Sequence, residues 1–257
     1  MLLNANIALC SSKALLVPYS SWHVPRYHEW MKDPEIQEAT ASEPLSLEEE
    51  YSMQRSWRQD ADKLTFIICR PITTGAEDDV PSQTQLQSES DSPANMVGDI
   101  NLFLRIDDGE EGDSPPQIVG EVELMIAEKI NQRCGFGRAA LLMFMRYIVQ
   151  NQGAILDEFV GGGGVDVETV RKLRTGVETA ASSEGLTFEC LSVKIGQTNL
   201  RSLALFEGLG FDRVSAEPNF FGEFELRKTD LSLGGVDGAL EGAKVLGFIA
   251  LPYERTE

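Results

Sequence analysis

Residues 120–151, GEVELMIAEKINQRCGFGRAALLMFMRYIVQN, carry the pattern that decides the fold of this chain. Apolar and polar residues alternate from Gly120 to Ile126, and this period of two predicts a β-strand with one buried face. The loop Gln132–Gly137 follows and leads into a run that begins at Arg138, is rich in helix formers and has apolar residues at helical spacing. The predicted order is strand, glycine-containing loop and helix.

A loop in this position can bind an anion. The first N–H groups of a helix have no acceptors within the helix and lie at the positive end of its dipole. Gly135 and Gly137 carry no Cβ, so a phosphate can approach their main chain closely. The alternative is a tight strand-to-helix turn that needs the two glycines for steric reasons alone. The residues by themselves leave both explanations open.

The sequence of the loop distinguishes between the known classes of phosphate-binding loop. A Walker loop ends in Gly-Lys-Ser/Thr, whereas Gly137 is followed by Arg138 and Ala139. A dinucleotide fingerprint needs three glycines, and only two are present. The pattern Gln-x-x-Gly-x-Gly after a strand instead resembles the pyrophosphate loop of the GNAT superfamily, the acyl-CoA-dependent N-acetyltransferases.

Composition indicates one globular domain. The 257 residues, 42% of them hydrophobic, are enough for one substantial core with insertions. The net charge of −19 is concentrated: Pro71–Asn95 and Asp107–Gln117 each hold five acidic residues and no Lys or Arg. No basic stripe with interleaved aromatic residues is found, so binding to nucleic acid is disfavoured.

Cysteine and histidine placement argues against a metal site or a disulfide framework. The four cysteines form no CxxC pair and are expected to be free thiols in a reducing compartment. His23 and His28 lie five residues apart, a spacing that does not put both on one helix face. Without a basic leader or a run of about 18 apolar residues, we expect a soluble cytoplasmic protein with no membrane segment.

The rest of the chain predicts further strands, helices and insertions. The expected elements are a first strand at 14–19, a helix at 21–30 with Ser21 as its N-cap, a helix started by the capping box at 46–49 and running to about 60, strands at 63–70, 96–104 and 186–195, a helix from 199 that ends at Gly210, and a hairpin over 211–226. A single domain over 1–228 would then contain disordered acidic insertions at about 72–95 and 107–118 and a Gly-rich insertion at about 152–185 with a candidate helix at 167–181, followed by a loose tail at 229–257.

This order of elements, β-α-α-β-β-β-loop-α-β-α-β-β, is similar to the GNAT fold, an α/β fold in which a mixed central sheet is splayed between strands 4 and 5 and flanked by helices. Segments such as GEVELMIAE and KIGQTNLRSLALFEGLGF, within the similar stretches 1–70, 96–106, 119–151 and 186–227, resemble the eukaryotic N-acetyltransferase 9-like family. That family is described as acetylating tubulin amino termini and is similar to bacterial ribosomal-protein acetyltransferases. The resemblance implies an acetyl-CoA-dependent N-acetyltransferase with a protein amino terminus, such as that of tubulin, as its acceptor.

The same resemblance implies where acetyl-CoA would bind. Its pantetheine and acetyl carbonyl would lie along the unpaired edge of the fourth strand, and its pyrophosphate on the glycine loop. Asn199, whose ordinary role would be that of an N-cap, matches an asparagine that contacts the CoA arm. The expected contacts are Met125, Ile126, Ala127, Gln132, Arg133, Cys134, Gly135, Phe136, Gly137, Arg138, Asn199 and Phe206.

Acetyl transfer to an amine also needs a base and a route for the leaving thiolate. Glu121 and Glu123 share one face of the predicted strand, and either can take a proton from an α-ammonium group, whose pKa is near 8; Asp99 is a third choice. The alternative for the two glutamates is a solvated sheet edge. Where many superfamily members have a tyrosine that protonates the thiolate, this chain has Phe206, so Ser202 or water would assist, or the thiolate would leave unaided.

Three functions stay open at this point. An acyl-enzyme on Cys134 is disfavoured, because the amine can attack the thioester directly. The leading hypothesis is acetylation of a protein amino terminus. The alternatives are a catalytically weak adaptor for a cytoskeletal partner, which Phe206 keeps open, and acetylation of a small-molecule amine.

Overall fold

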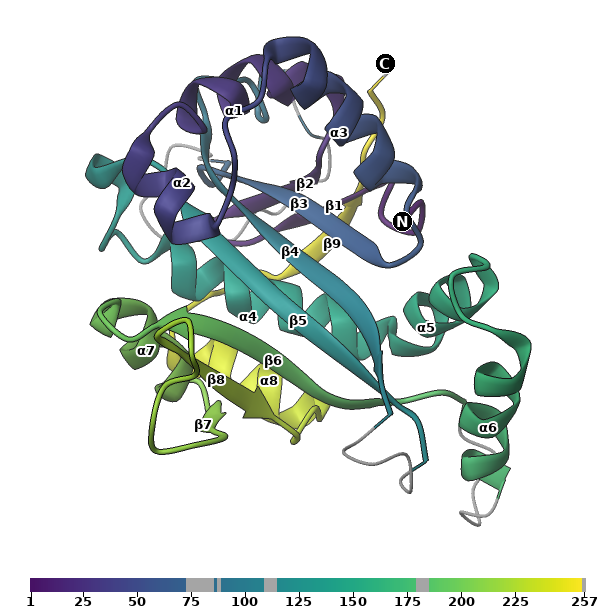
Figure 1. Cartoon of the computed structure of the whole chain (residues 1–257). Helices are drawn as coiled ribbons and strands as arrows, with labels where there is room; N and C mark the ends of the chain where they lie inside the picture. The colour runs from purple at the N-terminus through teal and green to yellow at the C-terminus, as the bar shows by residue number, and fades with distance from the viewer. Residues whose placement is uncertain (73–85, 87–88, 109–114, 179–184, 256–257) are drawn as a thin grey trace.

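The computed structural model describes residues 1–72, 86, 89–108, 115–178 and 185–255, apart from the side chains of 175–178. The described residues form one mixed sheet of nine strands flanked by helices (Figure 1). The strands are β1 (Ile7–Cys10), β2 (Leu15–Pro18), β3 (Lys63–Cys69), β4 (Met96–Asp107), β5 (Gln117–Ile126), β6 (Phe188–Gly196), β7 (Asp212–Arg213), β8 (Glu223–Lys228) and β9 (Ile249–Pro252), in the spatial order β7-β8-β6-β5-β4-β3-β2-β1-β9.

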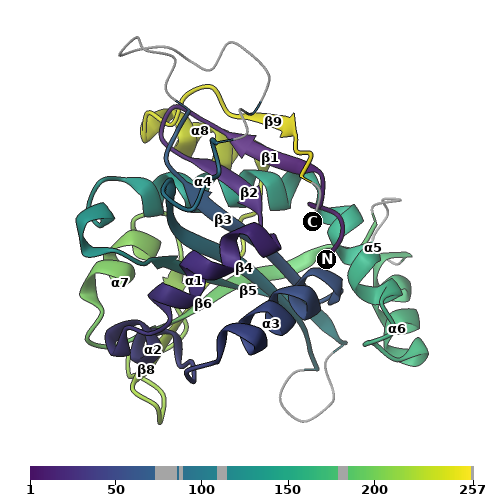
Figure 2. The same cartoon turned by 90° about the horizontal axis from the view of Figure 1, so that it is seen from above.

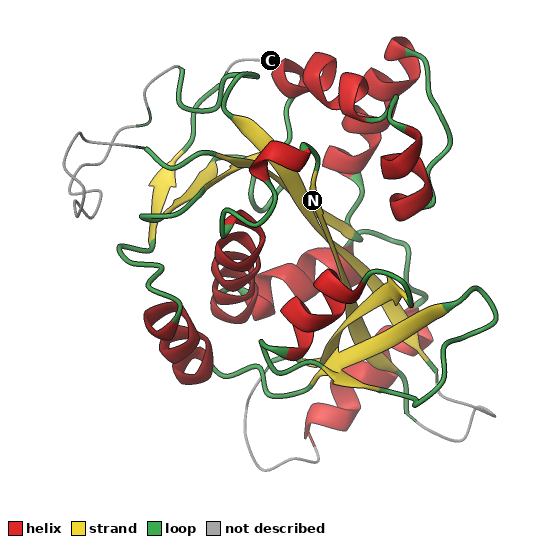
Figure 3. Cartoon of the chain, turned by 90° about the vertical axis from the view of Figure 1, so that its left-hand side faces the viewer, coloured by secondary structure: helices red, strands yellow, loops and turns green. Residues whose placement is uncertain are grey.

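Helices cover both faces of this sheet (Figure 3). On one face lie α1, α2 and α3, and on the other lie α4 and α8 (Figures 1 and 2). The helices are the 3-10 turns η1 (Ser21–His23) and η3 (Lys129–Asn131), and α1 (Val24–Trp30), α2 (Pro34–Thr40), α3 (Leu47–Gln59), α4 (Phe136–Gln150), α5 (Gln152–Gly161), α6 (Val167–Glu178), α7 (Leu200–Glu207) and α8 (Leu233–Gly242).

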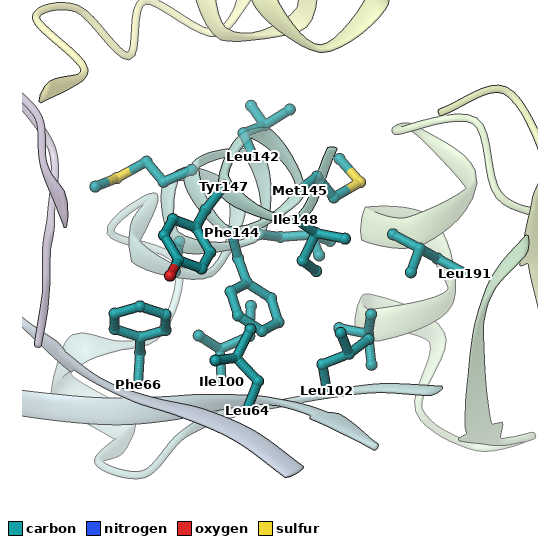
Figure 4. Close-up of a cluster of buried hydrophobic side chains, with 14 of the residues drawn as sticks. Leu64, Phe66, Ile100, Leu102, Leu142, Phe144, Met145, Tyr147, Ile148 and Leu191 are labelled. Atoms are coloured by element: carbon teal, nitrogen blue, oxygen red, sulfur yellow. The ribbon is translucent and has the colours of Figure 1, made fainter. Parts of the chain in front are cut away.

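The larger core lies between α4 and the sheet. The helix is apolar on nearly every side, as expected for one that is covered by the sheet, by α8 and by α5. Phe66 of β3 meets Phe144 and Tyr147 of α4 edge to face, with ring centroids 5.9 and 5.5 Å apart. Figure 4 shows these rings above Leu64 and Ile100 of the sheet. The predicted strand, loop and helix of residues 120–151 therefore form the centre of the molecule.

The sheet opens between β5 and β6, the strands predicted as the fourth and fifth. Their parallel pairing joins Ile118 to Phe188 and ends with Glu121 opposite Ser192 (Figure 1). On its other side, β5 stays paired with β4 as far as Ile126. One edge of residues 122–126 is thus left without a strand partner, which is the predicted splay.

Several local predictions need correction. The helix expected at 21–30 begins as η1 and continues as α1, and its N-cap is Ser20 rather than Ser21. Helix α2 was not predicted, although Asp33 caps it and Pro34 opens it. The capping box at 46–49 is confirmed, with Ser46 and Glu49 bonded to each other's main chain.

The Gly-rich insertion and the tail are more ordered than predicted. Residues 152–161 form α5, which buries Ile155, Leu156, Phe159 and Val160 in the core, while α6 confirms a helix within 167–181. In place of a loose tail, α8 packs on α4, and β9 pairs antiparallel with β1 (Figure 2). Sequence patterning missed these elements because each is short and contains glycine or only four strand residues.

The expected disorder of 72–95 and 107–118 falls largely on residues 73–85, 87–88 and 109–114, which lie outside the described part of the chain. Asp91 is an exception, because its side chain is only 5% exposed. It accepts hydrogen bonds from the Tyr253 hydroxyl at 2.8 Å and from Arg255 Nη2 at 2.5 Å, and lies 3.4 Å from His23 Nε2. The end of this insertion is therefore anchored to the C-terminal segment and to the start of α1.

Candidate functional site

A cleft of about 870 Å³ lies along the unpaired edge of β5 and reaches the loop that begins α4. Leu124, Met125, Ile126 and Ala127 of the splayed segment form one wall, and α7 contributes another. The remaining lining residues are Asp33, Glu35, Ile36, Ala39, Thr40, Lys129, Gln132, Arg133, Gly135, Gly137, Arg138, Asn199, Arg201, Ser202 and Leu205. Most residues predicted from the sequence to contact acetyl-CoA are thus brought together in one cleft.

The glycine loop has the geometry of an anion site. Gly135 is the N-cap of α4 with φ of 89°, which only glycine adopts easily, and Arg133 also has a positive φ, 61°. The first N–H bonded into the helix is that of Ala139, to the Gly135 carbonyl at 3.0 Å. The N–H groups just before it lie at the open end of the helix, beside the cleft.

Gly137 decides between the two explanations of the loop. A Cβ on this residue would lie 3.5 Å from Leu124 Cδ2, 3.7 Å from Leu205 Cδ2 and 3.8 Å from Ile126 Cγ1, all of which are ordinary contacts. Its φ is not positive, so neither local packing nor backbone conformation demands glycine here. Those three neighbours line the cleft, so a larger side chain would grow into it. This favours the ligand explanation at Gly137, whereas Gly135 is needed for its conformation.

Three other loop residues, all predicted to contact acetyl-CoA, differ from one another in their surroundings. Gln132 lines the cleft, but its Nε2 donates to the Ile126 carbonyl at 3.1 Å and so ties the loop to the end of β5. Phe136 packs against the core, and neither it nor Cys134 is among the described lining residues. The exposed Cys134 thiol lies 3.5 Å from the carbonyls of Ile130 and Gln132.

A second cleft, of about 530 Å³, opens on the face of the sheet that α1, α2 and α3 cover. It shares Leu124, Met125, Asn199 and Ser202 with the first cleft, so the two meet at the splay. Its polar floor is formed by side chains of adjacent strands: Asp99, Asn101, Glu121, Glu123 and Lys194. The registers Asn101 to Glu123 and Asp99 to Met125 place these groups on one face.

The carboxyl of Glu123 is poised to take a proton. It remains accessible to solvent, yet protein surrounds it closely enough that loss of hydration, followed by the negative charges of Asp99 and Glu121, raises its pKa to about 7. Asp99 is buried, and burial raises its pKa to about 6 despite hydrogen bonds from Asn101 at 2.8 Å and the Tyr27 hydroxyl at 3.4 Å. A base with a pKa near the working pH is the most effective.

Glu121 has a different environment from Glu123 although both lie on the predicted face. Lys194 Nζ donates to both of its oxygens, at 2.9 and 3.2 Å, and Glu121 lies at the last position where β5 pairs with β6, opposite Ser192. Glu121 is therefore held in an ion pair, whereas Glu123 faces carboxyls of its own sign. The structure therefore distinguishes two residues that the sequence left equivalent.

The three site residues predicted on α7 lie in different places: Asn199 and Ser202 line both clefts, whereas Phe206 borders only the second. Asn199 is the N-cap, because its Oδ1 accepts from Ser202 N–H at 3.2 Å, and it also lines both clefts, so both of its proposed roles are compatible with the structure. Ser202 is half-buried between the clefts. Phe206 is 2% exposed, lies edge to face on Phe211 at 5.1 Å and borders only the second of these clefts.

Sequence reasoning missed Tyr27, which lines the second cleft and donates its hydroxyl to Asp99. Burial and the nearby Asp99 carboxyl raise its pKa, so it stays a neutral donor. The helix around Tyr27 was predicted, but nothing in one sequence says which sheet residue its side chain would meet.

Within the residues that the structure describes, no group of three or more His, Cys, Asp or Glu side chains is placed to hold a metal ion. No described helix is both long and apolar enough to cross a bilayer.

Comparison with known proteins agrees with this geometry. A family model for the acetyltransferase (GNAT) domain matches residues 13–212. The human alpha/beta-tubulin-N-acetyltransferase 9 is 40% identical over 232 residues, which cover 89% of this chain and 86% of that protein. An N-acetyltransferase 9-like protein of Schizosaccharomyces pombe is 35% identical over 247 residues, 89% of this chain and all of that protein.

A solved GNAT acetyltransferase from Bacillus anthracis shares the fold, with a TM-score of 0.52 at 10% identity over 88% of this chain and 99% of that one. The splayed mixed sheet predicted from the sequence is thus confirmed as the GNAT fold. The chain belongs to the GNAT acetyltransferases, in their N-acetyltransferase 9-like group, and is an acetyl-CoA-dependent N-acetyltransferase.

Proposed function

We propose that this enzyme acetylates the α-amine of a polypeptide amino terminus, and that tubulin is one such acceptor. The names of its relatives support the choice of tubulin, since the human and mouse proteins, 40% and 38% identical, are called alpha/beta-tubulin-N-acetyltransferase 9. The observation that carries the proposal is the position of Glu123. It lies in the second cleft, which meets the first at the strand splay, with a pKa of about 7.

The first cleft is the proposed binding site of acetyl-CoA. Its pyrophosphate suits the N–H groups at the start of α4 with Arg133 and Arg138 nearby, and the unpaired main chain of residues 124–127 suits the amide groups of pantetheine. Acetyl-CoA supplies an acetyl group as a thioester, which an uncharged amine can attack. The residues of this cleft hold and orient that donor.

The second cleft is the proposed site of the acceptor. An amino terminus enters as an ammonium group, and the carboxyls of Asp99, Glu121 and Glu123 favour a cation there. Glu123 takes one proton from the ammonium, directly or through water, which leaves the amine lone pair free. Ser202, between the clefts, is the proposed donor of a hydrogen bond to the departing sulfur.

A panel of acceptors tests this proposal. Purified protein and acetyl-CoA are incubated with a lysine-free peptide bearing a free α-amine, with an α-blocked peptide bearing one lysine, and with spermidine, and products are identified by mass spectrometry. We expect one acetyl group on the first peptide, at its amino terminus. Acetylation of only the lysine peptide or only spermidine would overturn the proposal, and failure on all three, with CoA binding intact, would favour the adaptor alternative. A peptide with the tubulin amino-terminal sequence tests the proposal that tubulin is one acceptor.

A further inference from the structure

The carboxylate of Glu128 joins α1 to η3 beside the first cleft. Its Oε1 accepts a hydrogen bond from Arg26 Nη2 and another from Trp30 Nε1 at 3.2 Å, and its Oε2 accepts from Asn131 Nδ2 at 3.2 Å. The Arg26 guanidinium also lies over the Trp30 ring, 5.8 Å from its centroid. Both oxygens are therefore used, one toward α1 and the other toward η3.

The network continues from Asn131 into the sheet. The side chain of Asn131 is buried, and its Oδ1 accepts from Arg70 Nη2 at 2.9 Å, just after the end of β3. Next along the chain, Gln132 is bonded back to Ile126 at the end of β5. Residues 128–132 are thus tied to α1, to β3 and to β5 at the same time.

Residues 128–132 set the distance between the two parts of the proposed acetyl-CoA site, the unpaired edge of β5 and the anion-binding loop. This segment begins directly after Ala127, at the end of the unpaired strand edge, and ends at Gln132, the first residue of the anion-binding loop. The strand edge itself is fixed independently, because β5 is paired with β4 up to Ile126. A shift of residues 128–132 would move the loop relative to the edge while leaving the edge in place.

We infer that Glu128 is a positioning residue that fixes the anion-binding loop at the correct distance from the splayed edge of β5. The inference rests on the acetyl-CoA site proposed for the first cleft and is independent of the acceptor. A ligand that spans both parts, such as CoA, depends on the Glu128 network. A ligand that reaches only the strand edge, such as pantetheine, does not.

Replacing the carboxylate by an amide tests this. Glu128→Gln keeps the size of the side chain but has one oxygen, so it cannot accept from α1 and from Asn131 as before. We expect its calorimetric affinity for CoA to fall about tenfold and its affinity for pantetheine, followed by NMR titration, to change less than about twofold. Likewise, the KM for acetyl-CoA should rise about tenfold, and the KM for acetylpantetheine should change less than about twofold.

A second variant changes the same network at another residue, and a control variant changes a carboxylate outside it. Asn131→Asp keeps an acceptor for Arg70 but turns the donor facing Glu128 into a carboxylate, and we expect the same loss confined to CoA. Glu29→Gln removes an exposed carboxylate of α1 that pairs only with Lys32 among the described residues and should behave as wild type. Equal losses on CoA and pantetheine, or unchanged CoA affinity in both network variants, would overturn the inference.

A third variant shows whether a negative result means that Glu128 does not position the loop or that the first cleft does not bind CoA. Gly137→Val places a larger side chain in the cleft without involving Glu128. If Gly137→Val leaves CoA affinity unchanged, the first cleft is not the CoA site. If Gly137→Val weakens CoA binding and the Glu128 and Asn131 variants do not, the cleft assignment stands and the positioning role is wrong.

Discussion

Two glutamates on one strand face, Glu121 and Glu123, differ because of what the fold places beside them. Lys194 holds Glu121, whereas Glu123 faces Asp99 and Glu121, two groups of its own sign. Opposite charges stabilise a carboxylate, and like charges with poor hydration destabilise it. Identical side chains two residues apart are thereby suited to different tasks, a structural pair and a base.

Glu123→Gln should therefore remove the proposed base. At pH 7 we expect turnover to fall about 10²-fold, with acetyl-CoA affinity unchanged, and the deficit should shrink toward pH 9 as free amine accumulates. In the wild type, the rate should rise as pH rises through about 7, where Glu123 ionises. Because the folded pKa is raised above the unfolded value of about 4, the carboxyl costs stability that grows as pH rises from about 4 to about 7 and is complete above that, so the variant should melt no lower than wild type at pH 8.

The control for this prediction is Glu189→Gln, an exposed carboxylate of β6 that lines neither cleft, which should keep wild-type turnover. If Glu123→Gln and Glu121→Gln, singly and together, also keep wild-type turnover at pH 7, the base lies elsewhere, and Asp99 becomes the next candidate.

Substitutions at the two loop glycines should have different effects, on CoA binding at Gly137 and on stability at Gly135. Gly137→Ala fits its protein surroundings and should leave stability near that of wild type, whereas Gly137→Val should weaken CoA binding with stability little changed. Gly135→Ala must adopt φ of 89° and should lose about 1 kcal/mol of stability. Calorimetric titration with CoA and urea unfolding measure the two effects, and a Gly137→Val protein that binds CoA normally would contradict the assignment.

At the scale of elements, α5 shows how composition can mislead. Its sequence, QGAILDEFVG, ends at the first of four consecutive glycines and has the composition of a linker. The helix forms because Ile155, Leu156, Phe159 and Val160 fall on one side at helical spacing and meet the core, and this burial outweighs the low propensity of its glycines.

Residues 152–161 should consequently be essential for stability. Ile155 is fully buried, so Ile155→Ala should cost about 2–5 kcal/mol, measured by urea unfolding, because it leaves a cavity under α5. Val167→Ala on α6 removes an aliphatic group that is 86% exposed and should change stability by less than about 0.5 kcal/mol. A small effect at Ile155 would restore the linker interpretation.

Across the whole molecule, Asp91 connects distant parts of the chain. Burial opposes ionisation of Asp91, but hydrogen bonds from Tyr253 and Arg255, with the His23 ring 3.4 Å away, outweigh it and lower the pKa of Asp91 to about 2. Ser20 N–H donates to His23 Nδ1 at 3.1 Å, so we assign the ring proton to Nε2, which faces Asp91. Burial also lowers the pKa of His23, which keeps the ring neutral.

Asp91→Asn should weaken this connection between the C-terminal segment and α1. We expect a loss of about 2–4 kcal/mol at pH 7, measured by urea unfolding, since the partly exposed Arg255 guanidinium and the buried Tyr253 hydroxyl lose a charged partner. The folded pKa is depressed, so the contribution of Asp91 is complete above its unfolded pKa of about 4 and is lost as pH falls toward 2. The gap to wild type should close over that range, and Asp108→Asn, an exposed change, should show no gap.

Much of the fold and part of the site could be read from the sequence. The alternation of residues 120–126, the two glycines and the apolar helix after them define the centre of the sheet, because their periodicities are local properties of the chain. The same stretch contains most of the loop residues that the structure gathers in the first cleft.

Tertiary structure alone decided which groups meet. The ion pair of Glu121 with Lys194, the contact of Tyr27 with Asp99 and the network of Glu128 join residues 73, 72 and up to 102 positions apart. Likewise, β9 forms a strand only because β1 offers it an edge, and α5 a helix only because the core covers it. Local patterns report the period of an element, while burial, pKa and pairing depend on neighbours that only the folded chain supplies.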